Sequence, residues 1–218
     1  MKNILLVVAA AAAVVVAPML GCSHTHTVVV PVPPRVDLKP YGTIGIVDFT
    51  SNGDRATSSQ AMRQFEEQVQ EAQPGTRFLE LGSRDAVLAG VGSSEINPDS
   101  LRRIGQKYGV KAIILGEVVY SEPRTDIKMA DITRLEGGVR SELRADISGR
   151  LLETASGASV WTRSSWTKRQ LGTLNVSAGR GVSGSLAKAD PREEMVTTLV
   201  YHLTHYFRPT TVRETRPD

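Results

Sequence analysis

The segment "VKAIILGEVVY" (residues 110–120) is a nearly unbroken run of apolar residues, and it decides the fold. Runs of this kind form strands that are covered on both faces, as in the middle of a sheet flanked by helices. Ile113, Ile114 and Leu115 form the most continuous part of the run. The segment therefore predicts a central strand of an α/β sheet.

The residues before this segment alternate between strand and helix signals. The β-branched stretch "YGTIGIVDFT" (41–50) precedes the turn sequence "SNGD" and predicts a first strand. A helix is expected over 57–73, because apolar residues recur on one stripe and Pro74-Gly75 follows as a stop signal. We then expect a second strand at 76–82 and two helices, at 83–90 and 97–109.

The residues after the central segment change to strict alternation. From 139 to 152 one face carries Leu143, Ala145, Ile147, Gly149 and Leu151, and the other carries Glu142, Arg144, Asp146, Ser148 and Arg150. This period of two predicts a half-exposed strand, with "SVWTRSSWTKRQ" (159–170) as its hairpin partner. A Gly/Ser-rich loop is expected over 172–189, followed by an amphipathic helix from Asp190 to Pro209.

The resulting order, β-α-β-α-α-β-β-β-α, predicts the fold class. We expect one α/β domain over residues 41–208, with a mixed β-sheet, helices packed mainly on one face, and the charged hairpin face left in contact with water. Residues 209–218 are interpreted as a C-terminal tail.

The N-terminal segment has the pattern of a signal peptide. Lys2 precedes a stretch from Ile4 to Leu20 without a charged residue, and small residues follow. As a permanent transmembrane helix this stretch is marginal, because about 20 apolar residues are needed to cross a bilayer. We therefore interpret residues 1–21 as a signal peptide.

The single cysteine follows directly. Met19-Leu20-Gly21-Cys22 resembles a bacterial lipobox, which implies that Cys22 becomes the acylated mature N-terminus (diacylglycerol and palmitate). The alternative is an ordinary signal peptide beside a stray cysteine. Ser23, where an aspartate would favour retention, indicates the periplasmic face of the outer membrane. Residues 22–40, which include four prolines, are expected to form an extended tether.

Composition excludes several classes of protein. The formal net charge is only +3, and removal of the signal peptide lowers it by one, so nothing indicates a nucleic-acid partner. No disulfide can form within a chain that has one cysteine. The length supports a single hydrophobic core.

The sequence predicts no catalytic, metal or cofactor site. His24 and His26 are an incomplete ligand set beside Cys22, and His202 and His205 lack a carboxylate at matching spacing. No nucleophile motif or phosphate-binding loop appears.

A protein-binding surface is the remaining candidate site. Trp161 and Trp166 are five residues apart on one strand, so they lie on opposite faces, one under a helix and one exposed. Together with Arg144 and Arg150 they are the predicted partner-binding residues, since aromatic and arginine side chains anchor many interfaces.

Two motifs resemble a family of envelope proteins. "IGIVDFTSNGD" and "RRIGQKYGVKAIILGEV", with Gly105 and Gly109 in the second, are similar to the family that includes CsgG, the N-terminal domain of TolB, and LpoB. The resemblance implies a lipid-anchored, non-enzymatic adaptor or activator of an envelope-biogenesis partner, for example a peptidoglycan synthase. The alternative that it implies is a subunit of a CsgG-like secretion channel, with oligomers possible. A hydrolase is the third class considered.

The lipobox generates a direct prediction. Replacement Cys22→Ser should release the protein from the outer-membrane fraction, because the acylated residue is lost. Fractionation and the mass of the N-terminal peptide measure the result. An unchanged distribution, with no acyl mass on the wild-type peptide, contradicts lipidation.

Overall fold

The computed structural model describes residues 25–131, 136–177, 181–186 and 190–217. The chain divides into two units, Pro33–Pro209 and the outer segments on either side of it. The predicted signal peptide and Cys22 lie outside the described residues.

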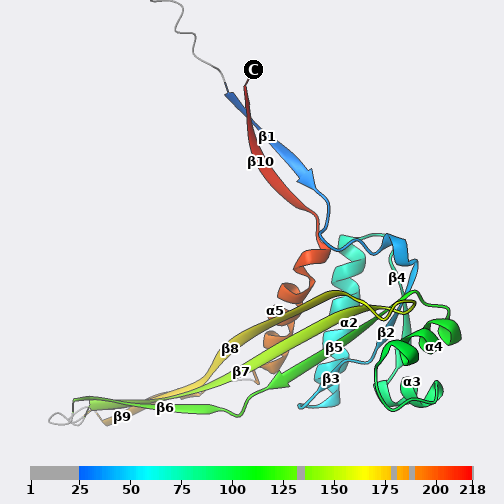
Figure 1. Cartoon of the computed structure of the whole chain (residues 1–218). Helices are drawn as coiled ribbons and strands as arrows, with labels where there is room; N and C mark the ends of the chain where they lie inside the picture. Colours follow the sequence, from blue (N-terminus) through cyan, green and yellow to red (C-terminus); the bar gives the residue numbers. More distant parts are fainter. Residues whose placement is uncertain (1–24, 132–135, 178–180, 187–189, 218) are drawn as a thin grey trace, which may run out of the picture. The chain divides into compact units, whose positions relative to one another are not determined.

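The larger unit contains a mixed sheet (Figure 1). Its order is β4-β2-β5-β7-β8-β9, with β3 paired to β5 and β6 paired to β7. β4, β2 and β5 are parallel, and the pairs from β5 to β9 are antiparallel. The strands are β2 (Thr43–Val47), β3 (Thr50–Ser51), β4 (Arg77–Gly82), β5 (Ala112–Tyr120), β6 (Arg124–Asp131), β7 (Glu136–Glu153), β8 (Ser159–Ser177) and β9 (Gly181–Leu186). The predicted α/β class with a mixed sheet is confirmed.

Helices cover both faces of the parallel half of the sheet. The two longest pack on one face and the other two on the opposite face. The first pair is α2 (Arg55–Ala72) and α5 (Arg192–Leu203), continued by the 3-10 turn η3 (Thr204–Phe207); the second pair is α3 (Arg84–Gly90) and α4 (Pro98–Tyr108). A further 3-10 turn, η2 (Lys39–Tyr41), precedes β2. Side-chain oxygens of Asp54, Ser83 and Asn97 cap α2, α3 and α4.

β5 is the central strand, as the apolar run predicts. Ile114 belongs to the larger hydrophobic cluster under α2 and α5, whereas Ile113 belongs to the smaller one under α3 and α4. Both are fully buried. Successive residues of a strand point to opposite faces, so only a strand covered on both sides keeps both isoleucines from water.

The larger cluster is centred on Phe65 of α2. Its ring lies 5.6 Å from that of Phe49, 5.7 Å from that of Phe207 and 6.5 Å from that of Trp161. Phe49 in turn lies on Gly116 of β5, where an added Cβ would come within 2.5 Å of the ring. Thus the "DF" and "LGEV" motifs contact each other, and glycine is required because a larger residue would displace the ring.

The end of α4 explains why the second motif has a glycine at position 109. Gly109 adopts φ 68°, a left-handed conformation that ends the helix at little steric cost. The chain then enters β5 directly.

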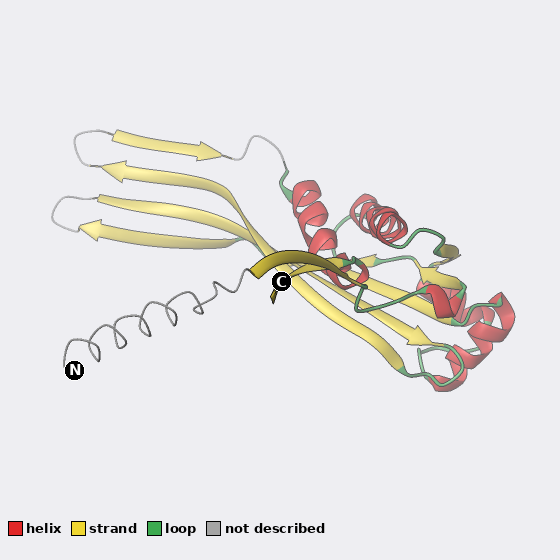
Figure 2. Cartoon of the chain, turned by 90° about the horizontal axis from the view of Figure 1, so that it is seen from above, coloured by secondary structure: helices red, strands yellow, loops and turns green. Residues whose placement is uncertain are grey.

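The expected loop over 172–189 is wrong. Residues Gly172–Ser177 continue β8 and pair with Gly181–Leu186 of β9. β6, which pairs with β7, has no counterpart in the predicted order. The extension formed by β6, β9 and the adjoining ends of β7 and β8 projects beyond the helices (Figure 2). Glycine and serine concealed the alternation of "TLNVS" and "GVSGSL", which is the signal that a hairpin requires.

The smaller unit corrects the expectation for the tether and the tail. β1 (Thr25–Val32) pairs antiparallel with β10 (Thr210–Pro217), from Thr25↔Pro217 to Val32↔Thr210. Within the expected tether, residues 25–32 form a strand that is paired with residues 210–217. β-Branched residues on both strands favour this pairing, and the partner segment is distant in sequence.

The central position of β5 can be tested by truncation. Ile113→Ala and Ile114→Ala should each lower the free energy of unfolding by about 2–5 kcal/mol, because each leaves a cavity in a different cluster. Val119→Ala, at a side chain that is 39% exposed, is the control and should cost less than about 1 kcal/mol. Urea denaturation measures all three, and equal stability of the isoleucine variants and wild type contradicts the assignment.

Candidate functional site

One face of the antiparallel half of the sheet lies outside both hydrophobic clusters. Opposed residues of β5, β7 and β8 form rows across it, such as Val119↔Asp146↔Trp166 and Glu117↔Ser148↔Ser164. Residues opposite each other share a face, as do alternate residues of one strand. We call this surface the bare face and define it by Glu117, Val119, Arg144, Asp146, Ser148, Arg150, Thr162, Ser164, Trp166 and Lys168.

The centre of the bare face is a cluster around Trp166, which is 57% exposed. The Arg144 guanidinium lies 5.1 Å from the Trp166 ring centroid, and the Lys168 ammonium lies 6.0 Å from it. Arg144 donates two hydrogen bonds to Asp146, from Nε at 2.9 Å and from Nη2 at 2.6 Å. Hydrogen bonding to Asp146 raises the pKa of Arg144, so the guanidinium stays charged.

This cluster contributes little to folding. The Arg144 and Asp146 side chains are 45% and 43% exposed, and exposed ion pairs contribute at most about 1 kcal/mol. The arrangement instead places two cations near an aromatic ring, and Asp146 holds one of them, Arg144, in position. Such a surface is suited to contact with another molecule.

The structure separates the four predicted partner-binding residues. The prediction of one buried and one exposed tryptophan is confirmed, because Trp161 is only 5% exposed and its ring lies 4.8 Å from that of Phe207. Trp161 is therefore a core residue, which corrects its proposed role in partner binding. Arg144 lies over the ring of Trp166, whereas Arg150 lies on the same face two rows away from Trp166.

Arg150 lines a small pocket at the border of the bare face. The pocket has a volume of about 210 Å³ and is also lined by Arg84, Asp48 and Glu117. Its position follows from the length of α3 and α4, which cover the sheet only up to this point. The alternation predicted that Arg150 would be exposed but gave no sign of the pocket.

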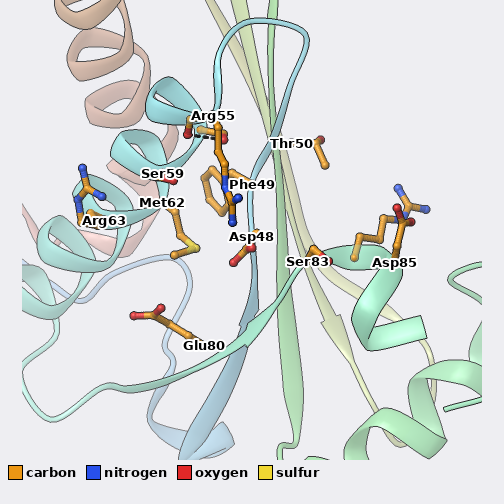
Figure 3. A pocket seen from close by; sticks show the side chains of 12 residues that line it. Asp48, Phe49, Thr50, Arg55, Ser59, Met62, Arg63, Glu80, Ser83 and Asp85 are labelled. Atoms are coloured by element: carbon orange, nitrogen blue, oxygen red, sulfur yellow. Dashed lines mark hydrogen bonds between the residues drawn. The ribbon is translucent and has the colours of Figure 1, made fainter. Parts of the chain in front are cut away.

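A larger pocket of about 690 Å³ lies at the carboxyl ends of β2 and β4 (Figure 3). This is where open α/β sheets bind ligands. Its charged lining residues are Arg55 and Arg63 from α2, Glu80 from β4, Asp48 after β2, and Arg84 and Asp85 at the start of α3. Three arginines and three carboxylates make its lining neutral overall.

The pocket offers hydroxyl and carboxylate groups that can bind a polar ligand. Its hydroxyl groups come from Thr50, Ser58, Ser59 and Ser83, and its lining includes no histidine, lysine or cysteine that could activate one of them. Ser58 Oγ donates to the backbone oxygen of Arg55. The sequence gave no signal for this site, because its residues come from four separate segments.

The described residues also offer no metal site. No group of three histidine, cysteine, aspartate or glutamate side chains within ranges 25–131, 136–177, 181–186 and 190–217 could hold an ion. His202 and His205 are exposed, and His24 lies outside the described residues.

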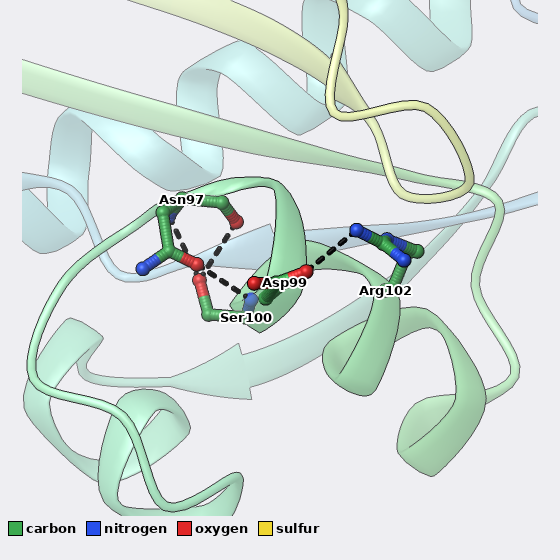
Figure 4. A network of polar contacts seen from close by, with 4 residues as sticks. All are labelled: Asn97, Asp99, Ser100 and Arg102. Atoms are coloured by element: carbon green, nitrogen blue, oxygen red, sulfur yellow. Dashed lines mark hydrogen bonds and ion pairs between the residues drawn. The ribbon is translucent and has the colours of Figure 1, made fainter.

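The polar network at Asn97 is structural (Figure 4). The Asn97 side chain accepts from the Ser100 backbone N–H at 2.8 Å, and the Ser100 hydroxyl accepts from the Asn97 N–H at 2.9 Å. Arg102 pairs with Asp99 on the same helix. These contacts close the N-terminus of α4.

The extension is two-sided. Register places Ile127, Val139, Leu174 and Gly184 in one row, and Asp126, Arg140, Thr173 and Ser185 in the adjacent row. Adjacent rows face opposite sides of a sheet. Ile127 is 73% exposed and Leu174 is 45% exposed, so this apolar row is not covered by the described part of the chain.

Within the described part of the chain, no helix is both long enough and apolar enough to cross a membrane.

Comparison with known proteins gives weak structural likenesses. No family model and no curated protein matches the chain. A PelC dodecamer from Paraburkholderia phytofirmans is 11% identical at TM-score 0.39, over 85% of this chain and 98% of that one. Lipoprotein GNA1162 from Neisseria meningitidis is 14% identical at TM-score 0.37, over 59% and 83%. The LpoB C-terminal domain from Salmonella enterica is 10% identical at TM-score 0.34, over 58% and 83%. These scores are too low to support an argument about function.

The different roles of the two tryptophans can be tested. Trp161→Ala should lower the free energy of unfolding by about 3–5 kcal/mol, because it empties part of the aromatic cluster. Trp166→Ala should change it by less than about 1 kcal/mol and should remove the fluorescence that acrylamide quenches most readily. Equal losses of stability in urea titrations would contradict the assignment of Trp166 to the surface.

Proposed function

We propose that this protein is a non-enzymatic envelope protein, anchored through acylated Cys22 at the periplasmic face of the outer membrane, that docks a protein partner through its bare face. The observation that carries the proposal is the cluster of Trp166, Arg144 and Lys168. It is exposed, internally ordered and unnecessary for the core.

The composition of the bare face supports a protein partner. Interface hot spots are enriched in tryptophan and arginine, and they are surrounded by polar residues that exclude water. Here Ser148 and Ser164 lie next to Trp166, and charges of both signs are present at Asp146, Arg144 and Lys168. A mixed-sign surface suits a specific protein contact better than a uniformly charged polymer.

Among the described residues that line the larger pocket, no hydrogen bond joins a hydroxyl group to one of the three carboxylates, and the Ser58 and Ser83 hydroxyls bond to backbone groups instead, which supports a role without catalysis. A partner active in envelope biogenesis, such as a peptidoglycan synthase, fits the predicted compartment. The adaptor would act by binding.

Partner capture tests this proposal. The double variant Arg144→Glu/Trp166→Ala should weaken capture from cross-linked envelopes at least tenfold, because it removes the anchor and reverses its charge. The control is Arg102→Glu on α4, an exposed site outside the bare face. Circular dichroism should give similar melting curves for all three proteins. Undiminished capture by the folded double variant contradicts the proposal.

The two-sided extension favours a second candidate, a subunit of a membrane-inserted secretion channel. Strands that span a bilayer need about 9–11 residues with alternate residues facing lipid. β7 and β8 have 18 and 19 residues, and the row of Ile127, Val139 and Leu174 is apolar while the adjacent row is polar.

Site-specific labelling separates the two candidates. Cys22 is the only natural cysteine, so Ile127→Cys and Leu174→Cys can each carry one polarity-sensitive fluorophore, with Asp126→Cys and Thr173→Cys as matched controls. In proteoliposomes, a channel subunit should give blue-shifted emission only from the fluorophores at residues 127 and 174. Native mass spectrometry should give the mass of a large oligomer. Identical emission at all four sites and a monomer contradict the channel.

A further inference from the structure

β8 is paired on one side along almost its whole length but on the other side only at its end. β7 pairs with it from Ser159 to Val176, whereas β9 pairs only with Gly172–Ser177. Among the described strands, none pairs with the outer edge of residues 159–171. At about 3.3 Å per residue, this edge is roughly 40 Å long.

Such an edge presents backbone N–H and C=O groups at every second residue, and these groups can pair with an added strand. Register shifts at Val160 and Leu171 bound the edge at its two ends. The stretch between them is regular. Beyond Leu171, β9 already pairs with this side of β8. An added strand along residues 159–171 would therefore lie end to end with β9.

The positive charge of the edge favours an acidic segment as the added strand. Residues 159–171 contain Arg163, Lys168 and Arg169 and no acidic residue. Arg169 pairs with Glu194 of α5 at 2.7 Å, and the Arg163 guanidinium lies 4.1 Å from the Tyr206 ring centroid. Two copies of this edge would repel each other, because like charges opposite one another destabilise a ladder.

The other free edge of the core sheet is a poorer acceptor. β4 has six residues, with Arg77 and Glu80 as its charged side chains, so it is shorter and close to neutral. The side chains next to the β8 edge include Trp166, which would contact an apolar residue of an added strand.

We propose that the outer edge of β8, from Ser159 to Leu171, accepts an extended acidic segment of the partner protein as an added antiparallel or parallel strand. This inference rests on the proposed docking function and names the chemistry of the partner. Affinity comes from backbone hydrogen bonds, and selectivity comes from Lys168 and Trp166 on the bare-face side of the edge strand and from Arg163 on its other side.

Amide-resolved hydrogen exchange of the full chain in zwitterionic detergent tests the proposal. The probe is a capped dodecapeptide of alternating glutamate and valine, and the control is the same peptide with lysine in place of glutamate. Alternate amides between residues 160 and 170 should exchange at least tenfold more slowly with the glutamate peptide only. Backbone N-methylation of that peptide at every second residue should abolish the protection.

A charge-matched pair of variants provides the second measurement. Ser164→Glu/Lys168→Glu places acidic side chains on the edge and should weaken binding of the glutamate peptide at least tenfold. Ser94→Glu/Arg103→Glu makes the same change of charge at exposed sites in and before α4 and should bind as wild type.

Three outcomes overturn the proposal: no protection by the glutamate peptide, equal protection by the lysine peptide, or protection that appears without peptide as protein concentration rises. The last outcome would assign the edge to a second copy. Partner capture that depends on Arg144 and Trp166 while the edge amides stay unprotected would leave the docking function in place and reject strand addition alone.

Discussion

The aromatic contacts of Phe65 hold this domain together. The buried Phe65 ring joins α2 to the end of β2 through Phe49, to β8 through Trp161, and to η3 through Phe207. These elements come from the beginning, middle and end of the unit. Phe49 also lies on Gly116 of β5, so the cluster fixes the position of β5 relative to α2. The covered half of the sheet depends on this arrangement.

The limits of that cover create the candidate sites. α3 and α4 have 7 and 11 residues, so they cover β2, the first part of β5 and the end of β7 at Leu152, but not the rest of the antiparallel strands. The bare face begins where they stop, and the Arg150 pocket marks the border. Two short helices thus decide how much of the sheet is available to a partner.

Sequence patterns predicted the parts of the fold that local chemistry determines. The unbroken run at 110–120 identified the central strand, and the two helices expected at 83–90 and 97–109 correspond to α3 and α4. The hairpin of β8 and β9 was missed because glycine and serine dilute its alternation. The pairing of β1 with β10 was missed because its register joins residues almost two hundred positions apart, which no local pattern encodes.

For the candidate site, the sequence predicted which side chains of a single strand are exposed, but not which side chains of different strands are in contact. Alternation placed Arg144 and Trp166 on the exposed side, but their contact depends on the register of β7 and β8. The burial of Trp161 rather than Trp166 depends on where α5 and η3 lie. The pocket of Asp48, Arg55, Arg63 and Arg84 collects residues from separate elements, so no spacing in the sequence announces it.

The irregularity at Leu171 has a consequence for how this protein can change. The pairing shifts there by one residue, from Glu142↔Gln170 to Ser141↔Gly172, so even-numbered residues of β8 beyond it share a face with the odd-numbered residues of β7. Leu174 joins Val139 and Ile127 for this reason alone. Deletion of Leu171 itself would leave Gly172 opposite Ser141 and both faces unchanged, whereas deletion of Gly172 with the irregularity kept would move Asn175 opposite Val139, where Leu174 had been. Insertions and deletions, rather than substitutions, are therefore the changes to which the extension is most sensitive over evolutionary time.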